Sequence, residues 1–193
     1  MATVTINVTA VNDAPVADNQ SVSTPEDTAL NITLTAADVE GNSLTYSIVA
    51  QPAHGTLSGT APNVTYTPAA NYAGTDSFTF KANDGTADSN VATVSINVTA
   101  VNDAPVADDK SASTAEGLPV NITLTGSDVD GDPLSYSIVT GPTHGVLSGN
   151  GAVVTYTPIA GYIGSDSFTF QATDGQVDSN VATVTINVGA ANN

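Results

Sequence analysis

The sequence predicts an all-β protein made of two tandem β-sandwich domains. Two observations lead to this prediction. The first is an internal repeat with an offset of 90 residues, which is close to the size of one small β-sandwich domain. The second is the alternation of apolar and polar residues along short segments of each repeat, a pattern typical of strands that bury one face. No segment shows the period of an amphipathic helix.

The repeat defines two domains of equal length. VNDAPVAD occurs at 11–18 and again at 101–108. Residues 11–100 align without a gap on residues 101–190, with roughly two-thirds identity. We therefore expect one domain at 11–100 and a second at 101–190.

Residues 2–10 repeat the last strand expected in a domain, without the rest of that domain. ATVTINVTA at 2–10 differs at one position from ATVSINVTA at 92–100. We interpret residues 2–10 as the leftover last strand of a preceding repeat. Because a lone strand is not stable in water, we expect this segment to be disordered or to pair with an exposed sheet edge of a neighbouring molecule.

Seven strands are predicted in each repeat. In LNITLT, for example, Leu30, Ile32 and Leu34 share one face, and the Thr and Asn residues between them suit an exposed strand surface. Seven short antiparallel strands per domain predict an immunoglobulin-like sandwich. In the first repeat we expect strands at 16–23, 29–36, 43–50, 55–58, 63–67, 76–82 and 91–98.

Composition excludes several classes of partner. The chain has 19 acidic residues against two lysines and no arginine, so its net charge is −17. Nucleic acid is therefore excluded as a partner, since phosphate binding needs Lys and Arg, and anionic membrane surfaces are disfavoured. No apolar run reaches the roughly 18 residues of a membrane span, so direct membrane insertion is not expected. The lack of cysteine rules out a disulfide framework.

The acidic residues gather in loops at the ends of the predicted sandwiches. Because consecutive strands run up and down, alternate loops share one end of a sandwich. The N-terminal end of the first domain then carries Asn12, Asp13, Asp38, Glu40, Asn42 and Asp84, and that of the second carries Asn102, Asp103, Asp128, Asp130, Asp132 and Asp174. The opposite ends carry Glu26 and Asp76 in the first domain and Glu116 and Asp166 in the second.

Like charges at this density favour a bound cation. The carboxylates repel one another unless a cation offsets them, and an all-oxygen ligand set favours a hard ion such as Ca²⁺. Stacking the domains end to end would bring Glu26 and Asp76 to the N-terminal end of the second domain, so we expect that junction to bind calcium most tightly. The other interpretation is that the acidic loops are only solvated.

Several motifs resemble cadherin repeats. SDVDGDPLSYSI at 127–138 and ADVEGNSLTYSI at 37–48 resemble the loop and strand that follow the second cadherin strand. VNDAPV is similar to the cadherin interdomain linker, TPEDT to its Pro-Glu element, and KANDGTADS and QATDGQVDS to its late Asp-Gly element. The resemblance implies that the calcium ligands between the two domains are Glu26, Asn102, Asp103, Asp128, Asp130 and Asp174.

One element departs from the vertebrate pattern. The Asp-Arg-Glu element of vertebrate cadherins is absent, and YTPAANYAGTDSFTF at 66–80 stands in its place. This segment is similar to bacterial cadherin-like tandem repeats of large secreted adhesins. We assign the ligand role of the missing element to Asp76, and this assignment depends only on the expected position of Asp76 in a loop.

Two functions remain open at this point. The first is a calcium-rigidified spacer, monomeric in isolation, in an extracellular or cell-surface bacterial adhesin whose parent protein is membrane-associated. The alternative is a calcium-dependent adhesion module that binds carbohydrate or a cell-surface partner directly. An enzyme is not expected, because no nucleophile or carboxylate accompanies His54 or His144 in the predicted turns and no catalytic motif is present.

Overall fold

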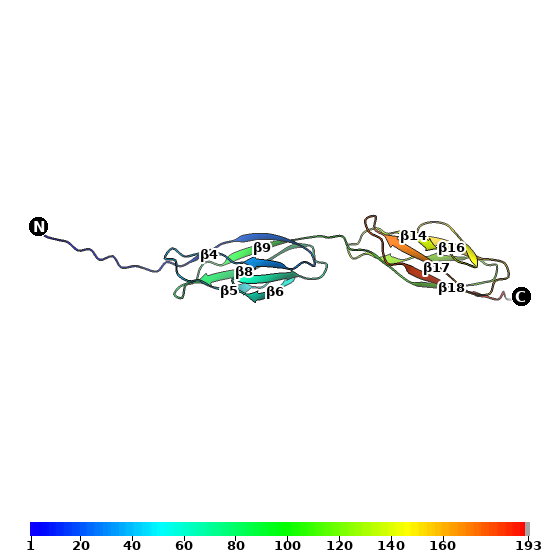
Figure 1. The fold of residues 1–193 in the computed structure, drawn as a ribbon, viewed down its shortest axis with the longest axis horizontal. Coiled ribbons are helices and arrows are strands. Elements are labelled where there is room, and N and C mark those ends of the chain that lie inside the picture. The colour runs from blue at the N-terminus through cyan, green and yellow to red at the C-terminus, as the bar shows by residue number, and fades with distance from the viewer. Residues whose placement is uncertain (192–193) are drawn as a thin grey trace. The chain divides into compact units, whose positions relative to one another are not determined.

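A computed structural model describes residues 1–191, which fold into two compact units (Figure 1). The first unit comprises Met1–Val101, and the second begins at Asn102. Both are β-sandwiches, which confirms the predicted all-β, immunoglobulin-like fold. Within residues 1–191 there is no helix of the length and apolarity that crossing a membrane requires.

The first unit contains nine strand segments, which correspond to the seven predicted strands because the first two strands are each interrupted once. The segments are β1 (Val16–Ala17), β2 (Gln20–Pro25), β3 (Leu30–Thr33), β4 (Ala36–Ala37), β5 (Thr45–Ala50), β6 (Gly55–Thr60), β7 (Asn63–Pro68), β8 (Gly74–Asn83) and β9 (Ala92–Thr99).

The second unit repeats this order. Its segments are β10 (Val106–Ala107), β11 (Lys110–Ala115), β12 (Val120–Thr123), β13 (Gly126–Ser127), β14 (Ser135–Thr140), β15 (Gly145–Ser148), β16 (Val153–Pro158), β17 (Gly164–Thr173) and β18 (Ala182–Gly189).

Each unit packs a four-stranded sheet against a three-stranded one. The sheet orders are β2-β9-β8-β5 and β3-β7-β6 in the first unit, and β11-β18-β17-β14 and β12-β16-β15 in the second. The short pairs β1–β4 and β10–β13 lie apart from these sheets.

The expectation of purely antiparallel pairing is wrong for the first strand of each unit. β2 runs parallel to β9, and β11 runs parallel to β18. The break between β1 and β2 makes this possible, because the chain leaves its antiparallel pairing with β4 and then joins the four-stranded sheet. Asn19 lies at this break, and its Oδ1 accepts the N–H of Thr93 at 2.8 Å.

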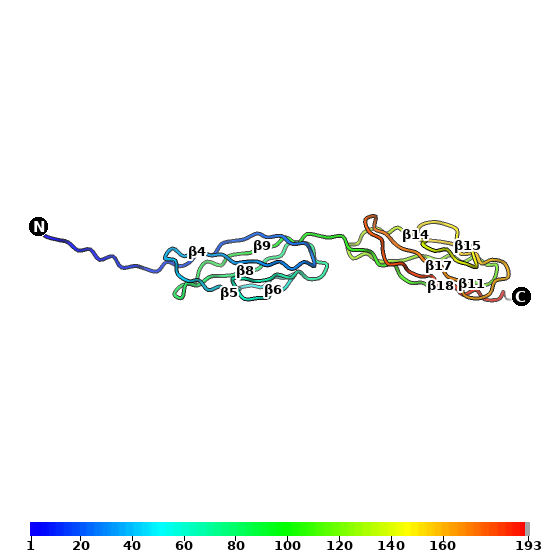
Figure 2. The backbone as a smooth tube through the Cα atoms, in the orientation of Figure 1, coloured from blue at the N-terminus to red at the C-terminus, as the bar shows by residue number. Residues whose placement is uncertain are grey.

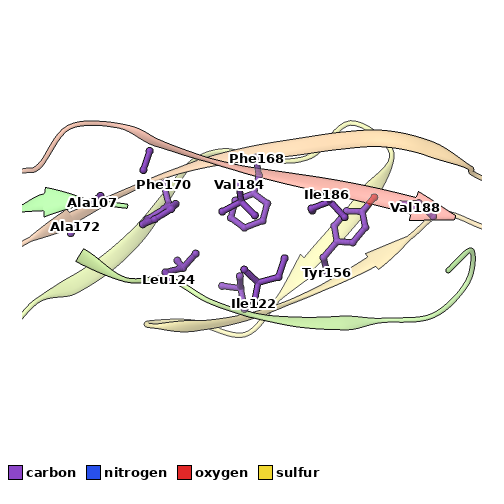
Figure 3. Close-up of a cluster of buried hydrophobic side chains, with 12 residues drawn as sticks. Ala107, Ile122, Leu124, Tyr156, Phe168, Phe170, Ala172, Val184, Ile186 and Val188 are labelled. Atoms are coloured by element: carbon purple, nitrogen blue, oxygen red, sulfur yellow. The ribbon is translucent and has the colours of Figure 1, made fainter. Parts of the chain in front are cut away.

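The core of each unit lies between the two sheets and consists of the apolar residues of one parity. In the second unit Val184, Ile186 and Val188 of β18 are at most 1% exposed, and they point toward Ile122 and Leu124 of the opposite layer (Figure 3). Fully burying one such side chain contributes about 1.5–3 kcal/mol. The counterparts in the first unit are Val94, Ile96, Val98, Ile32 and Leu34.

Residues 1–10 take no part in either sandwich. None of them belongs to a strand, and Val4, Ile6 and Val8 are 83%, 81% and 86% exposed. In Figure 2 this dark blue segment leads away from the strands of the first unit. Its assignment to a preceding repeat stays a prediction.

One buried carboxylate in each unit holds a turn against the sandwich. Asp76 is 8% exposed. Its Oδ1 accepts the N–H groups of Ala53 at 2.9 Å and Ser77 at 2.8 Å, and its Oδ2 accepts the N–H of His54 and the hydroxyl of Tyr66, both at 2.9 Å. The donors to Asp166 in the second unit are Thr143, His144, Ser167 and Tyr156.

The expected loop position of Asp76 and Asp166 is therefore corrected. β8 begins at Gly74, which pairs with Val98, so Asp76 lies inside a strand and points inward. Burial by itself would raise the pKa of Asp76, but the three backbone donors and the Tyr66 hydroxyl outweigh burial and hold its pKa below the usual value. Each oxygen of Asp76 already accepts two hydrogen bonds from its own unit. This carboxylate therefore has a structural role.

We predict that Asp76→Asn lowers the free energy of unfolding of the first unit by about 2–3 kcal/mol at neutral pH, because an amide cannot accept all four hydrogen bonds. Since the pKa of Asp76 is lower in the folded state, its contribution is present above the unfolded value of about 3.9 and is lost as the pH falls through the folded pKa. Urea denaturation at neutral and acidic pH measures the difference.

The matched control is Asp18→Asn, which changes an exposed carboxylate bonded to the Thr35 hydroxyl and should shift stability little. A stability difference between wild type and Asp76→Asn that stays constant from neutral pH down to about pH 2 would contradict the role given to the ionised carboxylate.

Candidate metal centre

Three aspartates converge in one loop at the N-terminal end of the second unit. Asp128, Asp130 and Asp132 each offer a carboxylate oxygen, and these oxygens lie within 4.8 Å of one another. The loop keeps this shape because Asp128 Oδ1 accepts the N–H groups of Asp130 at 2.9 Å and Asp132 at 3.3 Å. Gly131 has a φ of +80°, a left-handed conformation that favours glycine.

The start of the second unit joins this loop. The backbone N–H of Asp103 donates to Asp130 Oδ2 at 2.9 Å. The side-chain amide of Asn102 donates to Asp174 Oδ2 at 2.7 Å. Asp174 follows the end of β17, so three segments that are far apart in the sequence meet here. The structure thus brings together all six residues predicted for this end.

Asp174 is oriented by a turn of its own. Its Oδ1 accepts the N–H groups of Gln176 at 2.6 Å and Val177 at 2.7 Å. The hydrogen bonds from Val177, from the Asn102 side chain and from Gln176, in that order, lower the pKa of Asp174. The carboxylate is therefore held in its charged form, the form that a metal ion requires.

One oxygen of Asp128 is buried without a hydrogen-bond donor. Within residues 1–191, Asp128 Oδ2 has no hydrogen-bond partner, and the same holds for Asp38 Oδ2 at the matching position of the first unit. A buried carboxylate oxygen without a partner is costly, and an unaccounted ion is one of the established reasons for such an atom. The residues present therefore fit a cation with oxygen ligands.

The first unit carries a related cluster with fewer charges. Asn12 donates to Asp84 Oδ2 at 2.8 Å, and the N–H of Asn42 donates to Asp38 Oδ1 at 2.9 Å. The Asn42 amide also reaches Asn12 Oδ1 at 3.5 Å. Glu40 and Asn42 replace Asp130 and Asp132, and both Glu40 and Asp13 are exposed.

The remaining predicted ligands lie elsewhere in their own units. Glu26 is 4% exposed, and its Oε1 accepts the N–H of Val101 at 2.6 Å. Glu116 occupies the equivalent turn, where its N–H donates to Gly189 O at 2.9 Å. Within its own unit, neither Glu26 nor Glu116 belongs to the acidic cluster at the N-terminal end. The buried Asp76 and Asp166 do not belong to that cluster either.

One contact was not predicted from the sequence. The side-chain amide of Gln176 donates to Asn102 Oδ1 at 2.6 Å and so helps to fix the linker residue. The first unit has Thr86 at this position, so the repeat gave no signal for it. His54 and His144 lie in turns as expected, stacked on Tyr72 and Tyr162 with ring centroids 4.2 and 4.1 Å apart. The expectation that no carboxylate accompanies them is wrong for His144, whose Nδ1 lies 3.8 Å from Asp166 Oδ1.

Comparison with known families gives a clear result. The model of the bacterial Ig domain family (Big_9) matches residues 12–97 and again residues 102–187. The chain belongs to this family. The two matches account for most of the chain and repeat with the offset of the internal repeat, which establishes tandem bacterial Ig domains.

Tandem cadherin repeats are similar to this pair of bacterial Ig domains in fold. The human protocadherin-24 EC1-2 structure matches with a TM-score of 0.59 at 19% identity, over 94% of this chain and 100% of that chain. Human CDH23 EC21-23 matches with a TM-score of 0.59 at 16% identity, over 91% of this chain and 69% of that one. The predicted resemblance to cadherin-like tandem repeats is confirmed at the level of the fold.

A curated relative is found in Dictyostelium discoideum. Integrin beta-like protein A is 34% identical over 84% of this chain. The match spans only 10% of that relative's length, so the similarity concerns these domains alone.

We predict that Asp132→Asn stabilises the second unit when divalent metal is chelated. Removing one of three neighbouring charges relieves repulsion of about 1 kcal/mol for each remaining charge at the dielectric constant of water. The gain should shrink as salt is added, because salt screens exposed charges. Thermal unfolding in chelator at low and high ionic strength measures it. Asp108→Asn, which removes a charge bonded to the Thr125 hydroxyl instead, should give no gain, and an equal gain would show that only net charge matters.

Proposed function

We propose that these two domains are calcium-binding spacer repeats of a bacterial surface or secreted adhesin-type protein, with one calcium site at the N-terminal end of each unit. The convergence of Asp128, Asp130 and Asp132 around a buried oxygen without a donor carries the proposal. The proposed ligands are Asn102, Asp103, Asp128, Asp130, Asp132 and Asp174 in the second unit, and Asn12, Asp13, Asp38, Glu40, Asn42 and Asp84 in the first.

The donor set favours calcium over other biological cations. All the side-chain atoms offered are carboxylate or amide oxygens, which bind hard cations. Calcium accepts six to eight oxygens in an adaptable geometry, whereas Mg²⁺ demands a near-ideal octahedron and keeps several waters. Six residues from three separate segments suit the adaptable ion. With five carboxylates against four, the second unit should bind more tightly than the first.

The spacer role is supported by the position of the ligands along the chain. Asn102 and Asp103 begin the second unit directly after Val101, whose N–H is held by Glu26. An ion that binds Asn102 and Asp103 would therefore restrict the same short stretch of chain that leaves the first unit. Glu26 and Glu116 stay predicted ligands, while Asp76 and Asp166 are left out because their oxygens are already engaged.

A direct adhesion role is the second candidate. The relative from Dictyostelium carries the name integrin beta-like, which connects these domains with adhesion proteins and with an extracellular or cell-surface location. An adhesion module would bind carbohydrate or a cell-surface partner in the presence of calcium. A glycan array probed with and without calcium separates this role from the spacer.

We predict that isothermal titration calorimetry detects calcium binding by the wild-type chain and that Asp128→Ala with Asp130→Ala abolishes the tighter phase. Sites of this kind in extracellular modules have dissociation constants of about 10⁻⁴ to 10⁻³ M. The weaker phase, assigned to the first unit, should remain.

The matched control removes two other carboxylates of the second unit, Asp108→Ala with Asp109→Ala, and should keep both phases. A tight phase that survives the Asp128 and Asp130 changes would show that the ligands lie elsewhere.

Small-angle X-ray scattering tests the spacer role. We predict that calcium reduces the flexibility of the chain, because bound metal ties the linker residues Asn102 and Asp103 to the loops of the second unit. The Asp128→Ala, Asp130→Ala chain should lose this response. Identical scattering in calcium and in chelator, under conditions where calorimetry shows the site filled, would contradict the stiffening role.

A further inference from the structure

One hairpin turn of the second unit is more open than its counterpart in the first. In the first unit β6 and β7 stay paired up to Thr60 opposite Asn63. In the second unit the last pair of β15 and β16 before the turn is Ser148 opposite Thr155. Residues 149–152 therefore lie outside the strands. They read GNGA, where the first unit has GTAP.

This turn contains the one Asn–Gly pair of the sequence, Asn150 and Gly151. Both residues are exposed. Within residues 1–191, neither the Asn150 side chain nor the Gly151 N–H makes a hydrogen bond. Gly151 has a φ of +73°, and apart from its chain neighbours no atom of the described residues lies within 4 Å of the place where a Cβ would stand. The Gly151 nitrogen and the Asn150 side-chain carbonyl are therefore free to approach each other.

We propose that Asn150 is a site of spontaneous deamidation, which converts it to aspartate or isoaspartate while the chain stays folded. The backbone nitrogen of Gly151 gives up its proton and bonds to Asn150 Cγ. The Cγ–Nδ2 bond breaks, and Nδ2 leaves with a proton as ammonia, so that a cyclic imide remains. Water then opens the ring at one of its carbonyls, which gives aspartate or, with the main chain running through Cγ, isoaspartate. Water is the only co-reactant, and nothing is oxidised or reduced.

Ring closure requires the turn to rotate about the backbone bonds of Asn150. Glycine at the next position permits this rotation, because it has no Cβ and accepts conformations that other residues avoid. Asparagine is also among the thermolabile residues of proteins. The first unit has Thr60 at the position of Asn150, and a threonine has no side-chain carbonyl that a backbone nitrogen could attack.

The three Asp–Gly pairs of the chain could form the same imide, but their loops hold them in place. In each pair the glycine N–H donates a hydrogen bond. The acceptors are Asn83 Oδ1 at 2.7 Å for Gly85, Asp128 O at 3.3 Å for Gly131, and Thr173 Oγ1 at 3.2 Å for Gly175. Attack by any of these nitrogens would first break its hydrogen bond. The turn at residues 149–152 thus leaves its pair with a freedom that the other three lack.

The fold should tolerate the conversion, because the turn lies at a sheet edge. β15 is the edge strand in the order β12-β16-β15, and the turn is tied to the layer by the Leu124 N–H, which donates to Ala152 O at 2.8 Å. Conversion adds one negative charge and, in isoaspartate, lengthens the main chain of the turn by one carbon. Because hydrolysis of the amide is one-way, the modified fraction records the age of a population of chains. The reaction does not depend on the proposed calcium sites.

Peptide mapping of aged wild-type chain tests the proposal. The chain is kept at mildly alkaline pH, at a temperature where circular dichroism shows both units folded, and is then digested by pepsin in acid, where the backbone nitrogen keeps its proton. We expect Asn150 to gain the mass difference between NH₂ and OH, with isoaspartate among the products. The rate should rise with pH, because the attacking nitrogen must lose a proton. Asn150→Thr, which installs the residue of the first unit, should lack the mass change.

A second Asn–Gly pair in an ordered loop provides the matched control. Asp84→Asn places the same dipeptide where the Gly85 N–H is held by Asn83. In the folded chain that site should convert at least about tenfold more slowly than Asn150, since misplaced reacting groups can cost about 100-fold in rate. In urea at a concentration that unfolds both units, the two sites should convert at similar rates.

The wild-type chain alone also decides the question, should Asp84→Asn fail to fold. Asn150 should convert in the folded chain within about tenfold of its rate in urea, because the turn already has the required freedom. A larger slowing by the fold, or no conversion at all, would overturn the proposal. Equal rates at Asn150 and at the Asp84→Asn site in the folded chain would overturn it too. So would a difference between them that persists in urea, because neighbouring residues rather than the open turn would then select the site.

Discussion

The arrangement of the core and of the neighbouring strand in each unit depends on the pairing of the last two strands. β8 and β9 pair from Gly74 opposite Val98 to Phe80 opposite Ala92, and this register directs Phe78, Phe80, Val94 and Ile96 inward together. A slip of one residue would turn the whole row toward solvent. Because β9 also pairs with β2, the same register sets the start of the domain against its end. The loop between β8 and β9 is placed by it.

The acidic cluster depends on this frame rather than on attraction among its members. Carboxylates that repel one another come together because Asp174 follows the end of β17, Asp128 follows β13, and Asn102 lies at the entry to the unit. Backbone N–H groups and one asparagine amide orient these carboxylates. Part of the unfavourable free energy of bringing the like charges together is therefore already included in the folding of the chain. A bound cation would then meet ligands that are largely in place, which reduces the ordering that binding requires.

Much of this architecture could be read from local patterns. Alternation located the buried rows, and the 90-residue offset located the two domains, since both are properties of short segments or of direct repetition. The acidic residues of the second unit's N-terminal end could be grouped because strand count and direction decide which loops share an end.

The features that could not be predicted depend on contacts between distant segments. Asp76 was expected at the end of a loop because the predicted strand began at residue 76, yet β8 begins at Gly74, and the carboxylate finds donors in the turn at Ala53 and His54. The parallel pairing of β2 depends on a break in the strand at Asn19, and the local sequence does not indicate this break. The contact of Gln176 with Asn102 joins residues that are far apart and has no counterpart in the first unit.

The placement of the two lysines has a consequence for how the chain withstands digestion. Proteases that cut after lysine or arginine have only two target bonds here, after Lys81 and after Lys110. Lys81 lies within β8 and Lys110 begins β11, so both bonds belong to sheets rather than to exposed loops, where nicking concentrates. Trypsin-like enzymes can therefore cut only when a strand is locally unfolded. The rate of digestion by these enzymes then measures how often the sheet opens.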